Sequence, residues 1–432
     1  MAAATPPRFA VQRSPVILEM GSKFIKVGFA GDPSPLAIIP SVGKLPGGKL
    51  VSLMNESITP AERLEMFTMF LSDVYFKVLQ TNAKDRKIFV LLNLFDTHSL
   101  QKTLMSVLIT ALEVPAVCFV SPHMTIFPSI GPLHTGLIVD IGSVTRLIPV
   151  SHNSSIVGAW DLLPGMGFAG LVKHFKDILP NGSQVTSAKL QAGDDHSDNF
   201  EDSLNSSLRS EATPESSRSE DLIQELNVSD VCLELINRWL ACTTFSRSKR
   251  LLAGEKYGPD FPPFPDIPLR FNTVDGTKSY ELCLTGRQLE ETMEVFFQPN
   301  IDGETLPSAI LKVILKCPID LRRAMMENII VVGGMAAVKN FIPRINSELY
   351  AMVKEAEFAE KFQNPTFRFV STGKVPPNIV AWRGCSILVH ADYFPDNASF
   401  SRDDYLLRAS PHNVSNLLKE WCYVGKDRRI SR

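Results

Sequence analysis

Two short stretches of the sequence have residues that could hold a phosphate group. In "VILEMGSKFIKVGF", Glu19 precedes Gly21 and Ser22, and in "GLIVDIGSVTRLIPV", Asp140 precedes Gly142 in the same acid-x-Gly-Ser order. A tight turn of this kind presents backbone N–H groups to an anion. Because acid-x-Gly turns are also common in ordinary hairpins, the two copies carry more weight together than either alone. The sequence therefore predicts two phosphate-facing turns, each between two apolar strands.

The sequence offers few alternatives for catalysis. It has no G-x-x-x-x-G-K-[ST] loop and no G-x-G-x-x-G. Its histidines have no acid and nucleophile at a recognisable spacing, which argues against Ser/His/Asp and Cys/His sites. Its seven cysteines form no Cys-x-x-Cys pair, which argues against a zinc site and a disulfide framework. The remaining candidate is the Gly333-Gly334 turn, which follows the apolar stretch "NIIVV".

The composition excludes several classes of partner. A chain of 432 residues with 44% hydrophobic residues can bury a substantial core, and its net charge of −2 gives no reason to expect nucleic acid or an acidic membrane. No apolar run is long enough to span a bilayer. The first residues, "MAAATPPRFAVQRSP", lack the basic and apolar regions of a secretion signal. We therefore expect a protein of the cytosol or nucleus with reduced thiols.

Helix and strand patterns alternate around these turns. Thr59, Pro60 and Glu62 predict a helix that starts with a capping box. Apolar residues then continue at helical spacing and predict a core-facing stripe: Leu64, Phe67, Leu71, Val74 and Val78.

A continuous apolar run at 87–95 predicts a strand covered on both faces. A second amphipathic helix follows it, and this alternation favours a layered α/β architecture. The apolar residues of this helix are Leu100, Leu104, Val107, Leu108 and Leu112.

Three segments are predicted to lack regular structure. Residues 42–57 are short and rich in Gly and Pro, and residues 262–273 read as a Pro-rich connector. Residues 181–229 are rich in Ser, Asp and Glu and poor in large apolar residues, so they cannot bury enough surface to offset chain entropy. We expect this last segment to be a flexible acidic insertion.

The order of the motifs resembles the actin superfamily. The segments that carry the resemblance are "GFAGDPSPLAIIPS", "LIVDIGSVTRLIPV", "LKCPIDLRRAMMENIIVVGGMAAVKNFIPRI" and "NIVAWRGCSILV". Together they run from about Val16 to Tyr405, interrupted by the acidic insertion. The resemblance implies an α/β, two-lobed fold of the actin, hexokinase and Hsp70 ATPase type, built from a duplicated α/β unit with a central nucleotide cleft.

The resemblance also implies a division of the chain. Its parts are an N-terminal tail (1–15), a first lobe (16–135) with a shortened subdomain near 42–58, a second lobe (136–376) with an outer subdomain near 164–262 that carries the insertion (181–229), a return to the first lobe (377–405) and a C-terminal tail (406–432).

By resemblance, the nucleotide would be ATP or ADP, bound with magnesium. Glu19 and Asp140 match the carboxylates that hold the metal through water. The residues that match the nucleotide-binding positions are Gly21, Ser22, Lys26, Asp140, Gly142, Arg238, Gly333, Gly334 and Met335.

Several positions depart from the actin pattern. Lys23 replaces the second glycine of the first turn, and Ser143 stands where actins have an aspartate. The position of the water-activating glutamine falls on Pro122, which has no side-chain amide and no backbone N–H. The neighbouring His123 has no group predicted to orient it. We therefore expect a structural nucleotide at most, and no hydrolysis.

Within the superfamily, "CPIDLRRAMMENIIVVGG" and the late "EWCYVG" resemble the divergent actin-related proteins at the pointed end of dynactin. This implies a subunit of the cytoplasm and cytoskeleton that caps the pointed end of the actin-like filament and supports dynein-driven transport on microtubules. Its implied partners are the centractin filament and the other pointed-end subunits of dynactin, without nucleic acid, membrane insertion or self-polymerisation.

The pointed face of an actin offers a long loop that docks an apolar tip into a cleft of the next subunit. Residues 42–57 are too short for such a loop, whereas 343–352 and 382–388, on the barbed side, keep their patterns. A subunit with one competent face would end a head-to-tail assembly. Two alternatives remain at this point: a nuclear actin-related subunit of a chromatin-remodelling complex, and an actin-fold ATPase or small-molecule kinase.

Overall fold

The computed structural model describes residues 13–55, 57–93, 98–179, 184–188, 227–272, 279–395, 398–408 and 422–423. The chain divides into two compact units. Unit 1 contains Met1–Leu162, Lys312–Ala337 and Asn364–Arg432, and unit 2 contains Leu163–Leu311 and Val338–Gln363. This division follows compactness, whereas the predicted lobes follow the internal duplication, so the lobe boundaries stay a prediction.

The first sheet of unit 1 has seven strands in the order β16-β7-β6-β1-β2-β3, with β17 also paired to β7. β1 pairs antiparallel with β2 and parallel with β6, so the first predicted hairpin lies in the middle of the sheet. The strands are β1 (Val16–Glu19), β2 (Phe24–Phe29), β3 (Ala37–Pro40), β6 (Ile88–Leu91), β7 (Ala116–Val120), β16 (Phe400–Ser401) and β17 (Cys422–Tyr423).

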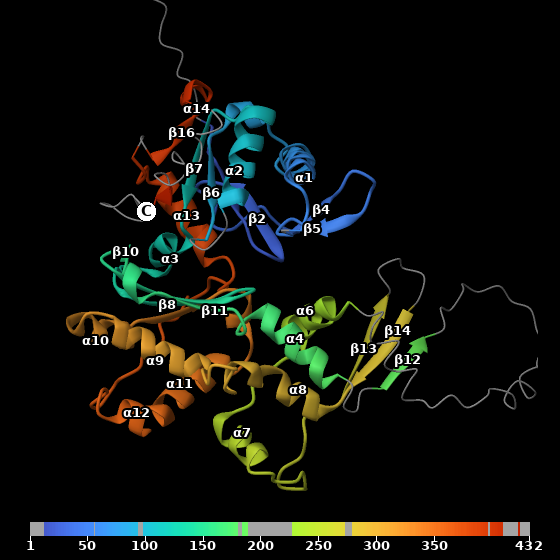
Figure 1. Ribbon diagram of the computed structural model, residues 1–432, viewed down its shortest axis with the longest axis vertical. Coiled ribbons are helices and arrows are strands. Elements are labelled where there is room, and N and C mark those ends of the chain that lie inside the picture. Colours follow the sequence, from blue (N-terminus) through green and yellow to red (C-terminus); the bar gives the residue numbers. More distant parts are fainter. Residues whose placement is uncertain are drawn as a thin grey trace, which may run out of the picture. The chain divides into compact units, whose positions relative to one another are not determined.

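Helices cover both faces of this sheet. The alternation of β1 directs Val16 and Leu18 into a core with α1 (Pro60–Asp73) and α2 (His98–Ser106), which lie next to the sheet in Figure 1. Ile17 points to the opposite face, toward α13 (Val380–His390), where the Trp382 indole N–H donates to the Ile17 carbonyl at 3.3 Å.

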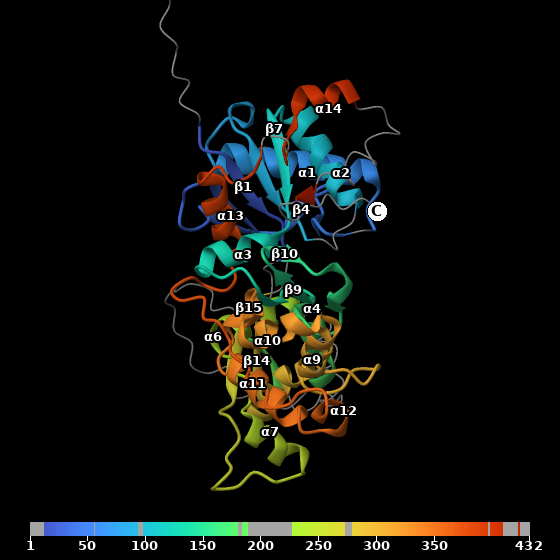
Figure 2. The ribbon, with the colours of Figure 1, turned by 90° about the vertical axis from the view of Figure 1, so that its left-hand side faces the viewer.

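The second sheet of unit 1 has the order β10-β9-β8-β15, with β11 paired to β9. β8 and β9 form the second predicted hairpin, and β15 pairs parallel with β8. The elements are α3 (Pro122–Ile130), β8 (Gly136–Ile141), β9 (Thr145–Ser151), β10 (Ser154–Ser155), β11 (Asp161–Leu163), α10 (Ile319–Glu327), β15 (Ile329–Val332) and α14 (Arg402–Arg408). α3 and α13 pack against each other, as Figures 1 and 2 show.

Unit 2 is mainly helical and contains one three-stranded sheet in the order β12-β14-β13 (Figure 1). Large apolar side chains from α4, the 3₁₀ helix Met293–Phe296 and α11 fill its core, including Phe175, Phe296 and Phe341. The elements are α4 (Phe168–Ile178), β12 (Gln184–Ala188), α6 (Val228–Arg238), α7 (Phe245–Leu252), β13 (Ile267–Asn272), β14 (Ser279–Leu284), α8 (Gly286–Thr292), α11 (Phe341–Met352) and α12 (Ala356–Ala359). Along the sequence, α9 (Leu306–Lys316) runs across the division between the units.

The predicted start of α1 is confirmed. The Thr59 hydroxyl accepts from the Glu62 backbone N–H at 3.3 Å, and the Glu62 carboxylate accepts from the Thr59 N–H at 3.0 Å. Phe67, Leu71 and Val74 are buried as predicted, but Leu64 is 41% exposed and Met66 takes its place in the core. The helical residues of α2 continue into a π-helical turn at Val107–Ala111.

The segments predicted to be irregular contain strands. Within 42–57, residues 42–52 form a hairpin of β4 (Val42–Lys44) and β5 (Leu50–Ser52), and Gly47 and Gly48 supply the positive φ angles of its turn. The predicted connector at 262–273 contains β13, because an edge strand tolerates Pro268. β12 and the start of α6 lie inside the predicted insertion (181–229), and its residues 181–183 and 189–226 lie outside the described part. The predicted strand at 87–95 is only four residues long.

Candidate functional site

Both predicted hairpins form, and in each the acidic residue lies directly opposite a cation. Glu19 on β1 is the cross-strand partner of Lys26 on β2, and Asp140 on β8 is the partner of Arg146 on β9. Lys26 Nζ forms an ion pair with Glu19 Oε1, and Arg146 Nη1 lies 3.4 Å from Asp140 Oδ2. All four side chains are less than a quarter exposed. Each hairpin thus contains one largely desolvated ion pair, with its atoms placed by strand register.

The sequence reading missed Arg146. The internal repeat could have revealed it, because superposing the two acid-x-Gly-Ser stretches and shortening the second turn by one residue places Arg146 at the position that corresponds to Lys26. The repeat shows that the two stretches correspond, but the register of each hairpin is needed to show which residues face each other.

The two hairpins share one electrostatic environment. Burial raises the pKa of the Asp140 carboxyl, while the nearby charges of Arg146 and Lys26 act in the opposite direction. Lys26 therefore acts on a carboxylate of the other hairpin as well as on Glu19. Both predicted phosphate turns lie in unit 1, and we treat them as one candidate site.

The Gly333-Gly334 turn packs against the second hairpin. Gly333 has φ +96°, and a Cβ at this position would lie 2.4 Å from the carbonyl oxygen of Ile141 at the end of β8. Only glycine permits this approach. A Cβ at Gly334 would meet nothing within 4 Å, and Met335 is buried. The first glycine therefore fixes the packing, whereas the second faces open space.

Most of the predicted nucleotide-binding residues lie in unit 1. Arg238 does not: it is the last residue of α6 in unit 2, where its largely exposed side chain forms an i,i+4 ion pair with Glu234. The predicted residues of unit 1 are Glu19, Gly21, Ser22, Lys26, Asp140, Gly142, Gly333, Gly334 and Met335.

Pro122 begins α3, and the next residue is oriented after all. The ring nitrogen Nδ1 of His123 lies 2.6 Å from the Ser121 hydroxyl, so the expectation that no group orients His123 was wrong. Burial lowers the pKa of His123 to about 3, which leaves the ring neutral. Its Nε2 has no hydrogen-bond partner among the described residues.

A small cavity joins His123 to the second hairpin. It has a volume of about 10 Å³ and is lined by His123, Asp140 and Arg146 among others. This space holds one water molecule at most. A phosphate group cannot enter it.

The residues present fit a phosphate but not a directly held metal ion. Each carboxylate already faces a cation, and the described residues contain no group of three His, Cys, Asp or Glu side chains that could hold a metal. Added Cβ atoms at Gly142 and Gly334 would meet nothing closer than 3.8 Å, so both turns are open. The buried Nε–H of Arg146 has no acceptor among the described residues.

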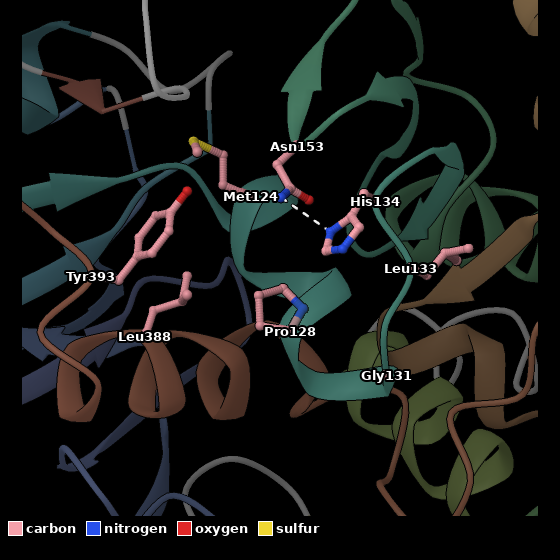
Figure 3. Close-up of a pocket in the computed structure, with 8 residues that line it drawn as sticks. All are labelled: Met124, Pro128, Gly131, Leu133, His134, Asn153, Leu388 and Tyr393. Atoms are coloured by element: carbon pink, nitrogen blue, oxygen red, sulfur yellow. Dashed lines mark hydrogen bonds between the residues drawn. The ribbon is translucent and has the colours of Figure 1, made fainter.

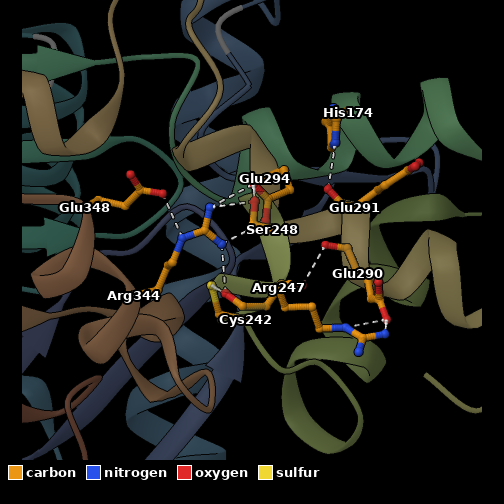
Figure 4. A network of polar contacts seen from close by, with 10 residues as sticks. His174, Cys242, Arg247, Ser248, Glu290, Glu291, Glu294, Arg344 and Glu348 are labelled. Atoms are coloured by element: carbon orange, nitrogen blue, oxygen red, sulfur yellow. Dashed lines mark hydrogen bonds and ion pairs between the residues drawn. The ribbon is translucent and has the colours of Figure 1, made fainter. Parts of the chain in front are cut away.

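A second buried polar network lies in unit 2 and is centred on Arg344 (Figure 4). Its Nε donates to Glu348 at 2.8 Å, its Nη1 to Glu294 at 3.0 Å and to the Thr243 carbonyl at 2.8 Å, and its Nη2 to Glu294 and to the Ser248 hydroxyl, both at 3.0 Å. The guanidinium is 2% exposed. It ties α7 and α11 to the turn that follows α8, with every donor direction used.

A neighbouring pair extends this network. Arg247 Nε donates to the fully buried Glu290 carboxylate at 3.1 Å, which also accepts from the Tyr257 hydroxyl at 3.2 Å and the Phe264 N–H at 3.1 Å. A groove of about 720 Å³ runs beside these residues. Because the carboxylates that line it are paired with arginines, the groove is explained as the surface of a structural network.

An apolar pocket of about 190 Å³ lies within unit 1 (Figure 3). Met124 and Pro128 on α3 form one wall, and Leu388 on α13 with Tyr393 forms another. At its polar end, Asn153 Nδ2 lies 3.3 Å from His134 Nδ1. Gly131 and Leu133 complete the lining.

One polar atom of this pocket has no partner. The buried Asn153 Oδ1 receives no hydrogen bond from the described residues. Such an acceptor is costly unless a water or a ligand donates to it. The pocket therefore combines an apolar cavity with one acceptor.

Comparison with known proteins identifies the family. The actin family model matches residues 11–164 and 263–406. Actin-related protein 10 of Dictyostelium discoideum is 21% identical over 457 aligned positions, which cover 95% of this chain and 89% of that protein. Actin-related protein 3 of Saccharomyces cerevisiae is 29% identical over 107 positions, or 21% of this chain and 24% of that protein.

The comparisons and the structure agree with the predicted class. The two sheets of unit 1 and the helices that cover them are mixed α/β, and the predicted actin-like fold is confirmed. Among the described residues, no helix is both long and apolar enough to cross a bilayer. Two matched hairpins, the Gly333 turn and a family match over most of the chain lead to one conclusion: the chain belongs to the actin family.

Proposed function

We propose that this chain is a structural subunit that ends an actin-like filament, at the pointed end of dynactin in the cytoplasmic cytoskeleton. The observation that carries the proposal is a contrast within unit 1. The chain keeps an apolar pocket that could receive a loop from a neighbour, but its own loop at 42–57 is too short to be received. Similarity to actin-related protein 10 along most of the chain supports the same assignment.

The pocket is suited to the tip of a docking loop. Its volume of about 190 Å³ is enough for one aliphatic side chain, and α13, one of its walls, belongs to the barbed-side elements named above. Asn153 Oδ1 offers an acceptor to a main-chain N–H of the inserted loop. A neighbour's loop could therefore be held by both its side chain and its backbone.

The loop that would continue the filament is reduced to a tight hairpin. β4 and β5 contain three residues each and are joined by a turn through Gly47 and Gly48. Leu53, which follows β5, is buried in the core, and Leu50 is 67% exposed on a hairpin too short to extend to a neighbouring subunit. One receiving face without a donating loop ends a head-to-tail assembly.

Filament capping tests this proposal directly. Labelled protein added to preformed centractin filaments should bind one end only and slow growth there, as seen by electron microscopy. Leu388→Asp puts a charge into the pocket and should abolish end binding. The matched control is Ile387→Asp, because Ile387 is on the same helix and exposed outside the pocket.

Three results would contradict the capping role. The first is binding along filament sides, the second is long filaments of the isolated protein, and the third is end binding that survives Leu388→Asp in a folded variant. Co-purification with chromatin remodellers, without centractin or the small pointed-end subunits of dynactin, would favour a nuclear role instead.

We also propose that the subunit does not hydrolyse nucleotide. Pro122 has no side-chain group to orient water, and the neutral His123 ring, with its low pKa, is a weak base at neutral pH. Purified protein should release no phosphate from ATP above a blank, even where ATP or ADP is recovered from it after denaturation. Turnover that is lost in Lys26→Ala would contradict this.

A further inference from the structure

The charge balance of the two phosphate hairpins differs from that of a metal-dependent site. The β1–β2 hairpin contains Glu19, Lys23 and Lys26, and the β8–β9 hairpin contains Asp140 and Arg146. Lys26 and Arg146 alone balance the charges of the two carboxylates. A divalent cation is bound by oxygen ligands with an excess of negative charge, and these hairpins lack that excess.

Arg146 lies next to one of the two carboxylates that would hold the metal. Its Nη1 lies 3.4 Å from Asp140 Oδ2, next to the carboxylate that the resemblance assigns to the metal. Lys26 pairs with the other assigned carboxylate, Glu19. Because the side chains of Lys26 and Arg146 are each only 12% exposed, their charges are weakly screened. A metal ion approaching Asp140 would meet the Arg146 guanidinium.

Arg146 also has an N–H group that donates to none of the described residues. Its buried Nε–H has no acceptor among the described residues, and the adjacent water-sized cavity is too small for an anion. On the open side, a Cβ added at Gly142 would come no closer than 3.8 Å to any atom, and the nearest is Arg146 Nη1. The next atom is the Val144 carbonyl oxygen at 3.9 Å, so a phosphate oxygen at the Gly142 turn would approach from the side of the guanidinium.

From this we infer that the hairpins bind a polyphosphate without a divalent cation, because Arg146 and Lys26 supply the positive charge that a metal would supply. The inference rests on the proposal that this site takes a nucleotide. It is independent of filament capping, which depends on the pocket between α3 and α13.

Equilibrium dialysis with radiolabelled ATP tests it. The affinity in excess EDTA should be within about threefold of the affinity in Mg²⁺. Arg146→Gln removes the cation and frees Asp140, so ATP binding in EDTA should weaken by at least about tenfold and recover when Mg²⁺ is added. The matched control is Arg323→Gln, which makes the same change at an exposed i,i+4 pair of unit 1 and should leave binding unchanged.

A wild-type measurement covers the case in which Arg146→Gln fails to fold. In an electron paramagnetic resonance titration, ATP-loaded protein should sequester no more Mn²⁺ than the same ATP free in solution. ATP binding that requires Mg²⁺, or extra Mn²⁺ held by the loaded protein, would overturn the inference. Absence of ATP binding in both EDTA and Mg²⁺ would also overturn it, while leaving the capping result unaffected.

Discussion

Two arginines, Arg344, which is buried, and Arg146, which is partly buried, differ in how completely they are hydrogen-bonded. Arg344 in unit 2 uses Nε, Nη1 and Nη2 in bonds of 2.8–3.0 Å, whereas Arg146 in unit 1 has one contact of 3.4 Å and a buried Nε–H without an acceptor among the described residues. Complete networks stabilise a fold, and incomplete ones are typical of places where a ligand finishes the bonding. We therefore interpret the Arg344 network as structural, and the proposed binding site is the one at Arg146.

The largest predicted effect tests the complete network. Arg344→Met leaves Glu294 buried without its main partner, so the free energy of unfolding should fall by about 3–5 kcal/mol. Urea denaturation followed by tryptophan fluorescence measures it. Arg323→Met, at an exposed pair, should cost less than about 1 kcal/mol.

The same measurement on Arg146→Met tests whether Arg146 contributes less to stability than Arg344. Because its ion pair is long and unfinished, we expect a loss of about 1–2 kcal/mol, clearly below that of Arg344→Met. Equal losses would mean that the Arg146 pair is as structural as the Arg344 network.

The next effect concerns pH. The pKa of His123 in the folded chain is about 3, below its ordinary value of 6.5, so between these values the unfolded chain binds more protons. Stability from this group is therefore complete above pH 6.5 and is lost as the pH falls toward 3, by about 1.4 kcal/mol per pH unit. His123→Gln should flatten the acid limb of a stability profile by that amount. An unchanged slope would show that His123 is accessible to protons in the folded state.

An effect of similar size tests the packing of the Gly333 turn. Gly333→Ala places a Cβ 2.4 Å from the Ile141 oxygen at a positive φ, and should cost about 1–3 kcal/mol. Gly334→Ala is the matched control, because a Cβ there meets nothing within 4 Å. Thermal unfolding of both variants measures the difference. Similar midpoints for the two would contradict the close packing of this turn against β8.

The smallest effect lies outside both networks. Thr59→Ala removes the capping box of α1 and should cost about 1 kcal/mol. Thr68→Ala, at the middle of the same helix with its hydroxyl bonded only to the Leu64 carbonyl, should change stability less. If Thr68→Ala were the costlier variant, the capping assignment would be wrong.

Local patterns were sufficient to predict the local structure. The capping box at Thr59 and the two acid-x-Gly hairpins could be predicted because each depends on residues close in sequence. β13 could not, because its pairing with β14 overrides Pro268, and the exposure of Leu64 depends on how α1 is rotated on the sheet. Sequence similarity pointed to the site, but the charge that distinguishes it, Arg146, required the strand register.

The interleaving of the two units has a consequence for how the protein is made. Unit 1 is built from three separate stretches of chain and unit 2 from two, and unit 2 is not complete before residue 363. During synthesis, β1, β2, β6 and β7 therefore emerge long before β16, which pairs with β7, and before α13, which covers Ile17. Contacts this distant in sequence form slowly, and a nascent sheet without its covering helix exposes apolar surface and unpaired strand edges. We expect the nascent chain to need a chaperone until α13 has been translated.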